Sequence, residues 1–218
     1  MSRDFMVAAL VTGRRGSKGF PNKNIHPVHG IPLTEFPIKY AKSCAAVDQV
    51  YVSTDCPEIK EIGIRNNCKV IDRPPELCTD VSSHYEVMSH GLEHITGELG
   101  QTPDLIVILL SNCAILKNGL IDEGIKLLKN DLKLDSCATV SEFPEYNVTR
   151  AMKIRGGLLE PFIPRDYLGV EGSDRYAPGK TYFCDSGAYI VRPHCLQASS
   201  SKFAYEWLGD RCKPLIQE

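Results

Sequence analysis

Met6-Val-Ala-Ala-Leu-Val-Thr12, followed by Gly13-Arg-Arg-Gly-Ser-Lys-Gly-Phe-Pro-Asn-Lys-Asn-Ile25, is the stretch of this chain that decides its fold. The apolar run predicts a buried strand over about 6–12. The segment after it combines three glycines with four cations, which indicates a loop rather than a helix. In open α/β sheets, ligands bind outside the carboxyl ends of the strands, and this loop leaves the first strand there. The sequence therefore predicts an α/β fold with an anion-binding loop.

The loop is suited to a small and highly anionic ligand. Gly13, Gly16 and Gly19 allow tight turns and let backbone N–H groups approach the ligand. Arg14 can neutralise phosphate oxygens through its planar fork, and Lys18 can do so as a point charge. Neither a Walker A pattern nor the glycine pattern of dinucleotide-binding folds is present. The other interpretation is a solvated basic turn. The four cations are Arg14, Arg15, Lys18 and Lys23.

Composition excludes several classes of protein. The 218 residues fit a single domain, and 43% apolar with 24% charged residues is typical of a globular chain. A net charge of −2 gives no general attraction to nucleic acid or to an anionic membrane. We see no apolar run of about 18 residues and no secretory signal pattern. The nine cysteines, an odd number with no Cys-x-x-Cys, indicate a reduced cytoplasmic chain without disulfides or a zinc site.

Short apolar runs alternate with helical stretches, which predicts a mostly parallel sheet with helices on both faces, a three-layer arrangement of Rossmann-like type. We expect one domain over 1–218. Residues 145–185 are rich in proline and tyrosine and predict an irregular excursion before a last strand returns to the sheet. The expected strands are 6–12, 49–53, 69–71, 104–110, 136–140 and 187–191, and the expected helices cover 32–44, a stretch starting at 57, 82–95 and 120–129.

Residues 13–25 resemble the opening loop of the CMP-sialic acid synthetases, or acylneuraminate cytidylyltransferases, which usually reads Ala-Arg-Gly-Gly-Ser-Lys-Gly-Ile-Pro-x-Lys-Asn-Ile. The related octulosonate synthetases have an arginine where this chain has Lys18. Three further segments agree with the family in order and spacing, so the resemblance covers essentially the whole chain. They are Val52-Ser-Thr-Asp55, Arg73-Pro-Pro-Glu-Leu77 with Asp80, and Asp135-Ser136.

The resemblance implies a homodimeric nucleotidyltransferase in which an oxygen of an acidic sugar attacks the α-phosphate of CTP and pyrophosphate leaves. It implies that Arg14 and Lys18 are catalytic, with Lys18 stabilising charge on the α-phosphate. It places Asn24 near the nucleotide, and Arg73 and Ser82 on the cytidine side. The alternatives are a salt bridge for Arg73 and a helix cap for Ser82. The implied CTP-binding set is Gly13, Arg14, Arg15, Gly16, Ser17, Lys18, Lys23, Asn24, Arg73 and Ser82.

Binding of the acidic acceptor is expected to depend on residues that depart from the usual family pattern. Where the family usually has a glutamine after the fourth strand, this chain has Ser111, and Asn112 offers an amide from a shifted position. The resemblance implies an acceptor of the sialic, legionaminic or pseudaminic acid type. This departure weakens the assignment to sialic acid itself, and a related nonulosonic acid or a phosphonate is the alternative acceptor. The excursion adds cations for the acceptor carboxylate, often from the dimer partner, with solvated surface as the alternative for each. They are Arg165, Arg175 and Lys180.

Mg²⁺ is expected because it accompanies nucleotide phosphates. The family usually carries an Asp-Ile-Asp-Thr metal motif shortly after a stretch like Pro214-Leu-Ile-Gln-Glu218, where this sequence ends. The expectation is that the motif lies beyond 218 or that Asp185 serves as the metal ligand, with a turn aspartate as the alternative. A nucleotide-binding pseudoenzyme is the non-enzymatic alternative. The histidines on the helix expected over 82–95 carry no predicted role, and a metal pair there is not expected.

Overall fold

A computed structural model describes residues 5–16, 19–143, 150–167, 180–197 and 202–217. Seven strands form one sheet in the order β11-β7-β10-β6-β1-β4-β5. Every neighbouring pair is parallel except those of β10, which runs antiparallel to both β6 and β7. The strands are β1 (Val7–Thr12), β4 (Gln49–Thr54), β5 (Lys69–Asp72), β6 (Leu105–Leu110), β7 (Ser136–Glu142), β10 (Tyr182–Val191) and β11 (Cys212–Ile216).

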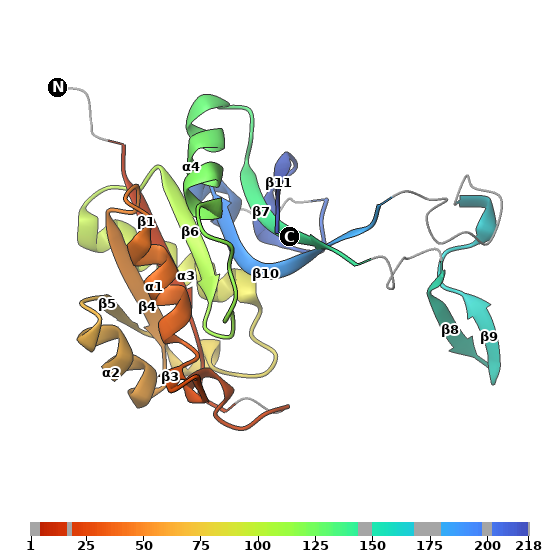
Figure 1. Cartoon of the computed structure of the whole chain (residues 1–218), viewed down its shortest axis with the longest axis horizontal. Helices are drawn as coiled ribbons and strands as arrows, with labels where there is room; N and C mark the ends of the chain where they lie inside the picture. Colours follow the sequence, from red (N-terminus) through yellow and green to blue (C-terminus); the bar gives the residue numbers. More distant parts are fainter. Residues whose placement is uncertain (1–4, 17–18, 144–149, 168–179, 198–201, 218) are drawn as a thin grey trace.

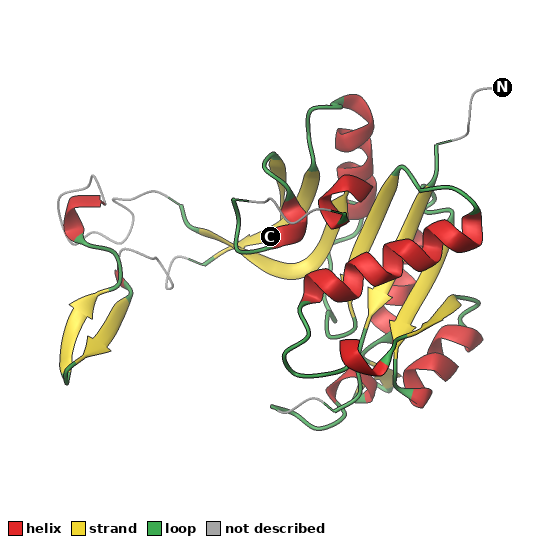
Figure 2. Ribbon diagram, turned by 180° about the vertical axis from the view of Figure 1, so that it is seen from behind, coloured by secondary structure: helices red, strands yellow, loops and turns green. Residues whose placement is uncertain are grey.

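Four helices cover the two faces of the sheet and complete three layers (Figure 1). Three of them lie on one face: α1 (Glu35–Ser43), α2 (Pro57–Arg65) and α4 (Leu120–Asn130). The fourth, α3 (His84–Leu99), crosses the opposite face, as Figure 2 shows from behind. Each face of the sheet has its own hydrophobic core, because the central strands are apolar on both sides, as buried parallel strands are. The predicted three-layer α/β fold is confirmed.

Two features of the sheet differ from the sequence prediction. The last predicted strand, 187–191, is the end of the longer β10, whose pairing with β7 is irregular between Cys184 and Tyr189. The strand β11 was not predicted, because Pro214 and Lys213 interrupt its apolar pattern. Both are tolerated because β11 is an edge strand. The helix expected from Pro32 begins at Glu35, because Pro32 pairs with Pro27 in a small ladder, β2 (Pro27–Val28) and β3 (Ile31–Pro32).

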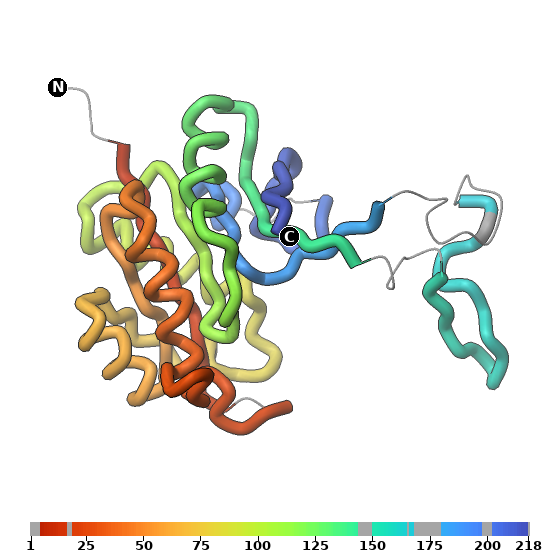
Figure 3. The backbone as a smooth tube through the Cα atoms, viewed as in Figure 1, coloured from red at the N-terminus to blue at the C-terminus, as the bar shows by residue number. Residues whose placement is uncertain are grey.

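The excursion carries a second small ladder away from the sheet. The hairpin of β8 (Met152–Arg155) and β9 (Leu158–Pro161) lies beyond the ends of β7 and β10, as the backbone trace in Figure 3 shows. In the part of the chain that the structure describes, no helix has the length and apolarity needed to span a bilayer. Short 3₁₀ turns complete the structure: Lys23–Ile25, Pro75–Leu77, Arg165–Tyr167, Pro193–Leu196 and Glu206–Leu208.

Asp135, which directly precedes β7, connects the C-terminal segment to the sheet through hydrogen bonds. Its Oδ2 accepts hydrogen bonds from the backbone N–H groups of Asp210 and Arg211, each at 2.9 Å. Its Oδ1 lies 3.0 Å from Nε2 of His194. Burial raises the pKa of the Asp135 carboxyl, but the backbone bonds from Arg211 and Asp210 and the contact with His194 outweigh it, so the pKa is lowered. The ionised carboxylate therefore stabilises the folded chain.

We expect Asp135→Asn to lower the free energy of unfolding at neutral pH by about 0.5–1.5 kcal/mol, because the backbone N–H groups of Asp210 and Arg211 lose a charged acceptor. A carboxyl with a lowered folded pKa stabilises above its unfolded value of about 3.9 and loses that contribution as pH falls through the folded value. The difference in free energy of unfolding between wild type and variant should therefore become smaller at acidic pH. Urea unfolding across pH measures it, with the exposed Glu93→Gln on α3 as the control. A gap that is absent at neutral pH, or constant with pH, would contradict this role.

Candidate active site

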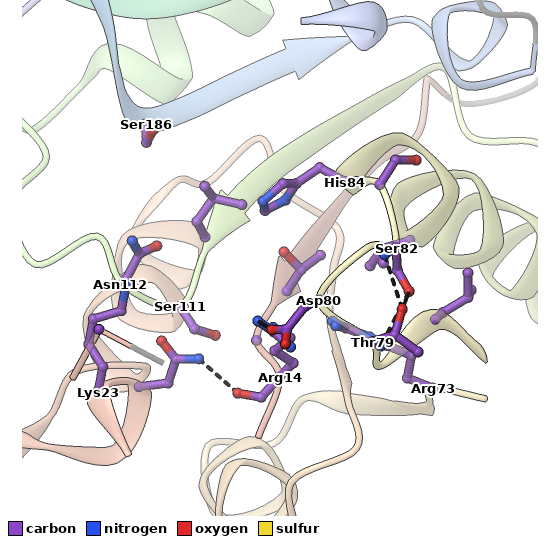
Figure 4. A pocket seen from close by; sticks show the side chains of 18 of the residues that line it. Arg14, Lys23, Arg73, Thr79, Asp80, Ser82, His84, Ser111, Asn112 and Ser186 are labelled. Carbon is purple, nitrogen blue, oxygen red and sulfur yellow. Dashed lines mark hydrogen bonds and ion pairs between the residues drawn. The ribbon is translucent and has the colours of Figure 1, made fainter. Parts of the chain in front are cut away.

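An open pocket of about 640 Å³ lies at the carboxyl ends of β1 and β6, beside the first turn of α3. This is the position expected for a ligand in an open α/β sheet. Figure 4 shows side chains from the loop after β1, the segment after β5 and the end of β6 facing the same space. The predicted site residues on its wall are Gly13, Arg14, Lys23, Asn24, Arg73, Ser82, Ser111 and Asn112.

The floor of the pocket is a close contact between Gly13 and Ser111. The backbone N–H of Gly13 donates to the carbonyl of Ser53 at 3.1 Å, and that of Ser111 donates to Thr12 at 2.9 Å. A Cβ atom added to Gly13 would lie 2.2 Å from Ser111 Oγ, so no larger residue fits without movement. Ser111 is 1% exposed, and its hydroxyl has no hydrogen-bond partner among the described residues. Ser111 thus supports the loop from below instead of reaching across the pocket.

Arg14 lies on the wall with its charge directed along the pocket. Its Nη2 donates to Asp80 Oδ1 at 2.5 Å, and its carbonyl accepts from Asn24 Nδ2 at 3.1 Å (Figure 4). The Arg14–Asp80 pair is partly exposed, so it adds little to stability. Its effect is to orient the guanidinium fork, whose geometry matches phosphate oxygens.

Arg73 adds a second, buried cation. It is 8% exposed, and its Nη2 donates to the carbonyl of Ser53 at 2.8 Å. Burial lowers the pKa of this guanidinium. No carboxylate of the described residues forms an ion pair with it within 4 Å, so the salt-bridge interpretation finds no support. A buried cation without an ion-pair partner, at the wall of a pocket, suits an anionic or polar ligand.

Ser82 is not the cap of α3. The helix begins with Ser83 as its cap, whose Oγ accepts from the N–H of Glu86 at 3.1 Å in a capping box. Ser82 Oγ donates instead to the carbonyl of Glu76 at 2.8 Å and lies 2.7 Å from Thr79 Oγ1. These bonds fix the turn before α3, which contributes to the pocket wall.

Other predicted residues lie elsewhere. Arg15 and Gly16 line a smaller hollow of about 80 Å³, on the side of the loop that faces Cys56 and Glu58. The backbone N–H of Arg15 donates to Asp55 Oδ1 at 2.9 Å, and this bond holds the Arg15 backbone on the side of the smaller hollow. Gly16 has φ +74°, which a glycine adopts without strain. Ser17 and Lys18 lie outside the described residues.

Of the predicted acceptor residues whose side chains the structure describes, Ser111 and Asn112 line the pocket and Lys180 does not. Lys180 is exposed and forms a 2.8 Å ion pair with Glu142, on the segment that leads to the excursion. Arg165 belongs to a 3₁₀ turn of the excursion, and its side chain lies outside the described residues. Arg175 lies outside them as well. Among these excursion cations the structure describes the side chain of Lys180, which does not line the pocket of the same chain.

Asp185 is surrounded by donors. Its Oδ1 accepts from Thr139 Oγ1 at 2.6 Å and from the N–H of Gly187 at 3.0 Å. Its Oδ2 accepts from Ser141 Oγ at 2.6 Å and from Gln217 Nε2 at 3.2 Å. Both oxygens are therefore saturated, and as arranged they do not fit a magnesium ion. The arrangement agrees with the other interpretation, an aspartate that holds the irregular turn of β10.

Sequence reasoning assigned no role to His84, although it lines the pocket. It is the first residue of α3, directly after the cap. Its position in the sequence could have indicated this role. His84 follows Ser82 by two residues, and the start of the helix lies at the edge of the sheet where the strands carry the pocket.

Comparisons with known proteins agree with this geometry. The family model described as Cytidylyltransferase matches residues 8–151. The chain is 28% identical to the pseudaminic acid cytidylyltransferase of Campylobacter jejuni over 200 residues, which cover 89% of this chain and 84% of that protein. It is 38% identical to N-acylneuraminate cytidylyltransferase A of Danio rerio over 82 residues, 38% of this chain and 19% of that protein. The chain thus matches about a fifth of the length of the N-acylneuraminate enzyme.

Solved structures support the fold. CMP:2-keto-3-deoxy-manno-octonic acid synthetase complexed with CTP has a TM-score of 0.65 at 16% identity, covering 97% of this chain and 90% of that one. A 4-diphosphocytidyl-2C-methyl-D-erythritol synthase has a TM-score of 0.66 at 12% identity, covering 99% and 91%. At these identities the likeness concerns the fold alone.

Proposed function

Because this chain belongs to the cytidylyltransferase family, we propose that it transfers CMP from CTP to an acidic sugar of the sialic, legionaminic or pseudaminic type and releases pyrophosphate. The observation that carries the proposal is the pocket wall. Arg14 and Lys23 from the glycine-rich loop, and the buried Arg73, face one space at the carboxyl end of β1. This is the charge distribution that a nucleoside triphosphate needs.

The reaction needs alignment and charge stabilisation more than covalent help. An acceptor oxygen forms a bond to the α-phosphorus, the bond to the β-phosphate oxygen breaks, and the acceptor proton passes to solvent. In this scheme Arg14 holds the phosphates, and Lys18 stabilises the charge that develops on the α-phosphate. Mg²⁺ enters as the ion that accompanies CTP, and no described carboxylate is assigned to it.

A panel of acceptors tests the proposal. CTP, Mg²⁺ and the protein are incubated with sialic, legionaminic or pseudaminic acid, or with a phosphonate, and pyrophosphate release is measured. We expect turnover with at least one of the three sugars. Release with the phosphonate alone would refute the proposal that the acceptor is an acidic sugar. The phosphonate is included because Ser111, which stands where the family usually has a glutamine, is buried below the pocket. CTP binding with no release on any acceptor would favour the pseudoenzyme alternative.

We also propose that the protein is a homodimer that pairs through the excursion. The hairpin register puts Met152, Ile154 and Leu159 on one face. Their exposed fractions are 53%, 77% and 69%. Lys153 and Glu160 lie on the other face, 4.0 Å apart. A lone two-stranded hairpin is marginally stable in water, so its apolar face needs a cover. A second copy would supply it and would bring the excursion cations, Lys180 among them, to the partner's acceptor site.

The nine free thiols favour a reducing compartment, the cytoplasm.

Ile154→Glu is expected to shift the protein from dimer to monomer, because it buries a charge in the proposed interface. Analytical ultracentrifugation measures the change. Arg155→Gln, on the opposite face of the same hairpin, is the control and should leave the dimer intact. A wild type that sediments as a monomer, or an Ile154→Glu variant that stays dimeric, would refute this interface.

A further inference from the structure

The loop after β6 and the irregular part of β10 together form the part of the pocket where the acceptor is expected. The loop contributes Asn112, and β10 contributes Ser186. Figure 4 shows both residues on the side of the pocket away from Arg73. The two segments are distant in the sequence, so the spacing between Asn112 and Ser186 depends on contacts that join them.

Ser186 has a backbone conformation that a residue with a side chain seldom adopts. Its φ angle is +62°, in the left-handed region. It lies in the stretch where the pairing of β10 with β7 is irregular. Such a conformation persists only where the surrounding structure enforces it. The preceding residue, Asp185, supplies this constraint, because its carboxylate accepts from the N–H of Gly187 and from two hydroxyl groups of β7.

The side chain of Gln217 connects this part of β10 with the loop after β6. Its Nε2 donates to Asp185 Oδ2 at 3.2 Å, and its Oε1 accepts from the backbone N–H of Lys117 at 2.8 Å. The backbone N–H of Gln217 donates to the carbonyl of Val140 at 2.8 Å, which anchors the residue to β7. One half-buried amide thus holds both segments against the sheet.

The two segments also pack directly against each other beside this amide. A Cβ atom added to Gly187 would lie 3.1 Å from Leu116 Cδ1, so the side chain of Leu116 lies over the backbone of β10. The middle of the loop is held separately, by the Tyr40 hydroxyl that donates to the carbonyl of Ala114 at 2.9 Å. Loss of the Gln217 amide would therefore release the end of the loop and Asp185, while the rest of the loop stays in place.

We propose that Gln217 is a positioning residue that sets the spacing between Asn112 and Ser186 and thereby the affinity for the acceptor, an inference that rests on the proposed function. Gln217 is not part of the described pocket wall, so it acts through Asp185 and Lys117. Its described hydrogen bonds involve neither the loop after β1 nor the buried Arg73. Binding of CTP should therefore not depend on it.

The first test measures kcat and KM for CTP and for an acceptor that turns over in the panel described above. We expect Gln217→Ala to raise KM for the acceptor about 10-fold, because small displacements of positioning groups are costly, and to leave KM for CTP within about 2-fold of wild type. A variant that only lost folded protein would show a lower kcat and unchanged KM values. Lys213→Ala, at an exposed position of the same strand, is the control and should behave as wild type.

The second test reverses the polarity of the bond between Gln217 and Asp185. Gln217→Glu places a second carboxylate against Asp185 and should weaken acceptor binding at least as much as Gln217→Ala. Asp185→Asn in the Gln217→Glu background again sets an amide donor opposite an oxygen acceptor. This double variant should recover part of the acceptor affinity that Gln217→Glu loses, and no recovery would overturn the role assigned to this bond.

An unchanged KM for the acceptor in Gln217→Ala would overturn the proposal. An equal rise in both KM values, or a fall in kcat alone, would overturn it too, because either would indicate a general effect on the fold. The wild type separates the two levels of inference. If it releases pyrophosphate and Gln217→Ala matches it, only the role of Gln217 fails, whereas a wild type that releases none with any acceptor refutes the proposed function.

Discussion

Replacing Arg14 by alanine is expected to lower kcat/KM for CTP by about 10²–10³-fold, the usual loss when one charge-stabilising donor is removed from a phosphoryl- or acyl-transfer site. Arg14 is the described loop cation whose fork is already oriented, through Asp80 at 2.5 Å and through the bond from Asn24 to its carbonyl. Steady-state pyrophosphate release measures the effect. The fold should persist, because the ion pair that is lost is partly exposed.

Two variants make this prediction specific. Arg15→Ala removes the neighbouring cation, which faces the smaller hollow, and should cost far less activity. Asp80→Asn keeps the Arg14 charge and removes only its carboxylate partner, so it should fall between wild type and Arg14→Ala. Equal losses in Arg14→Ala and Arg15→Ala would mean that general positive charge matters, and the assigned geometry would be wrong.

Gly13→Ala should cost both activity and stability. The new methyl carbon would lie 2.2 Å from Ser111 Oγ and 2.7 Å from Ser111 Cβ, so the loop or the end of β6 must move. Overpacking of this kind costs about 1–3 kcal/mol of unfolding free energy. Misplacing a binding loop by about 1 Å can cost about 10²-fold in rate. Thermal or urea unfolding and pyrophosphate release measure the two effects.

A second substitution at the same contact should reverse these losses. Ser111→Gly in the Gly13→Ala background removes both clashing atoms and should restore most of the activity and stability. Gly19→Ala, with open space around the position, is the control for glycine replacement in the loop. If Gly13→Ala is as active and stable as wild type, the floor contact does not position the loop.

The sequence predicted the layers of the fold because each central strand is a continuous apolar run, as in Leu105–Leu110. It could not predict β11, whose short, interrupted pattern becomes a strand only by pairing with β7. Nor could it tell which way β10 runs, since direction depends on where the excursion returns the chain.

At the site, spacing located the loop but not the directions of its side chains. The sequence alone does not distinguish the roles of Arg14 and Arg15, which are neighbours of the same type. In the structure the bond from the Arg15 N–H to Asp55 holds Arg15 on the other side of the loop. The family loop usually begins with alanine, and the position after β6 usually carries glutamine. That Gly13 and Ser111 fill each other's space is visible only in three dimensions. The donors around Asp185 likewise come from segments distant in the sequence.

The fate of the α-phosphate of CTP tests the central claim most directly. The protein is incubated with Mg²⁺, CTP radiolabelled at the α-phosphate and an acidic sugar acceptor, and the products are separated. We predict that the label appears in a CMP-sugar and that unlabelled pyrophosphate is released in equal amount. Label that stays in CTP, or that appears in CDP or free CMP without a sugar conjugate, would contradict the proposed transfer.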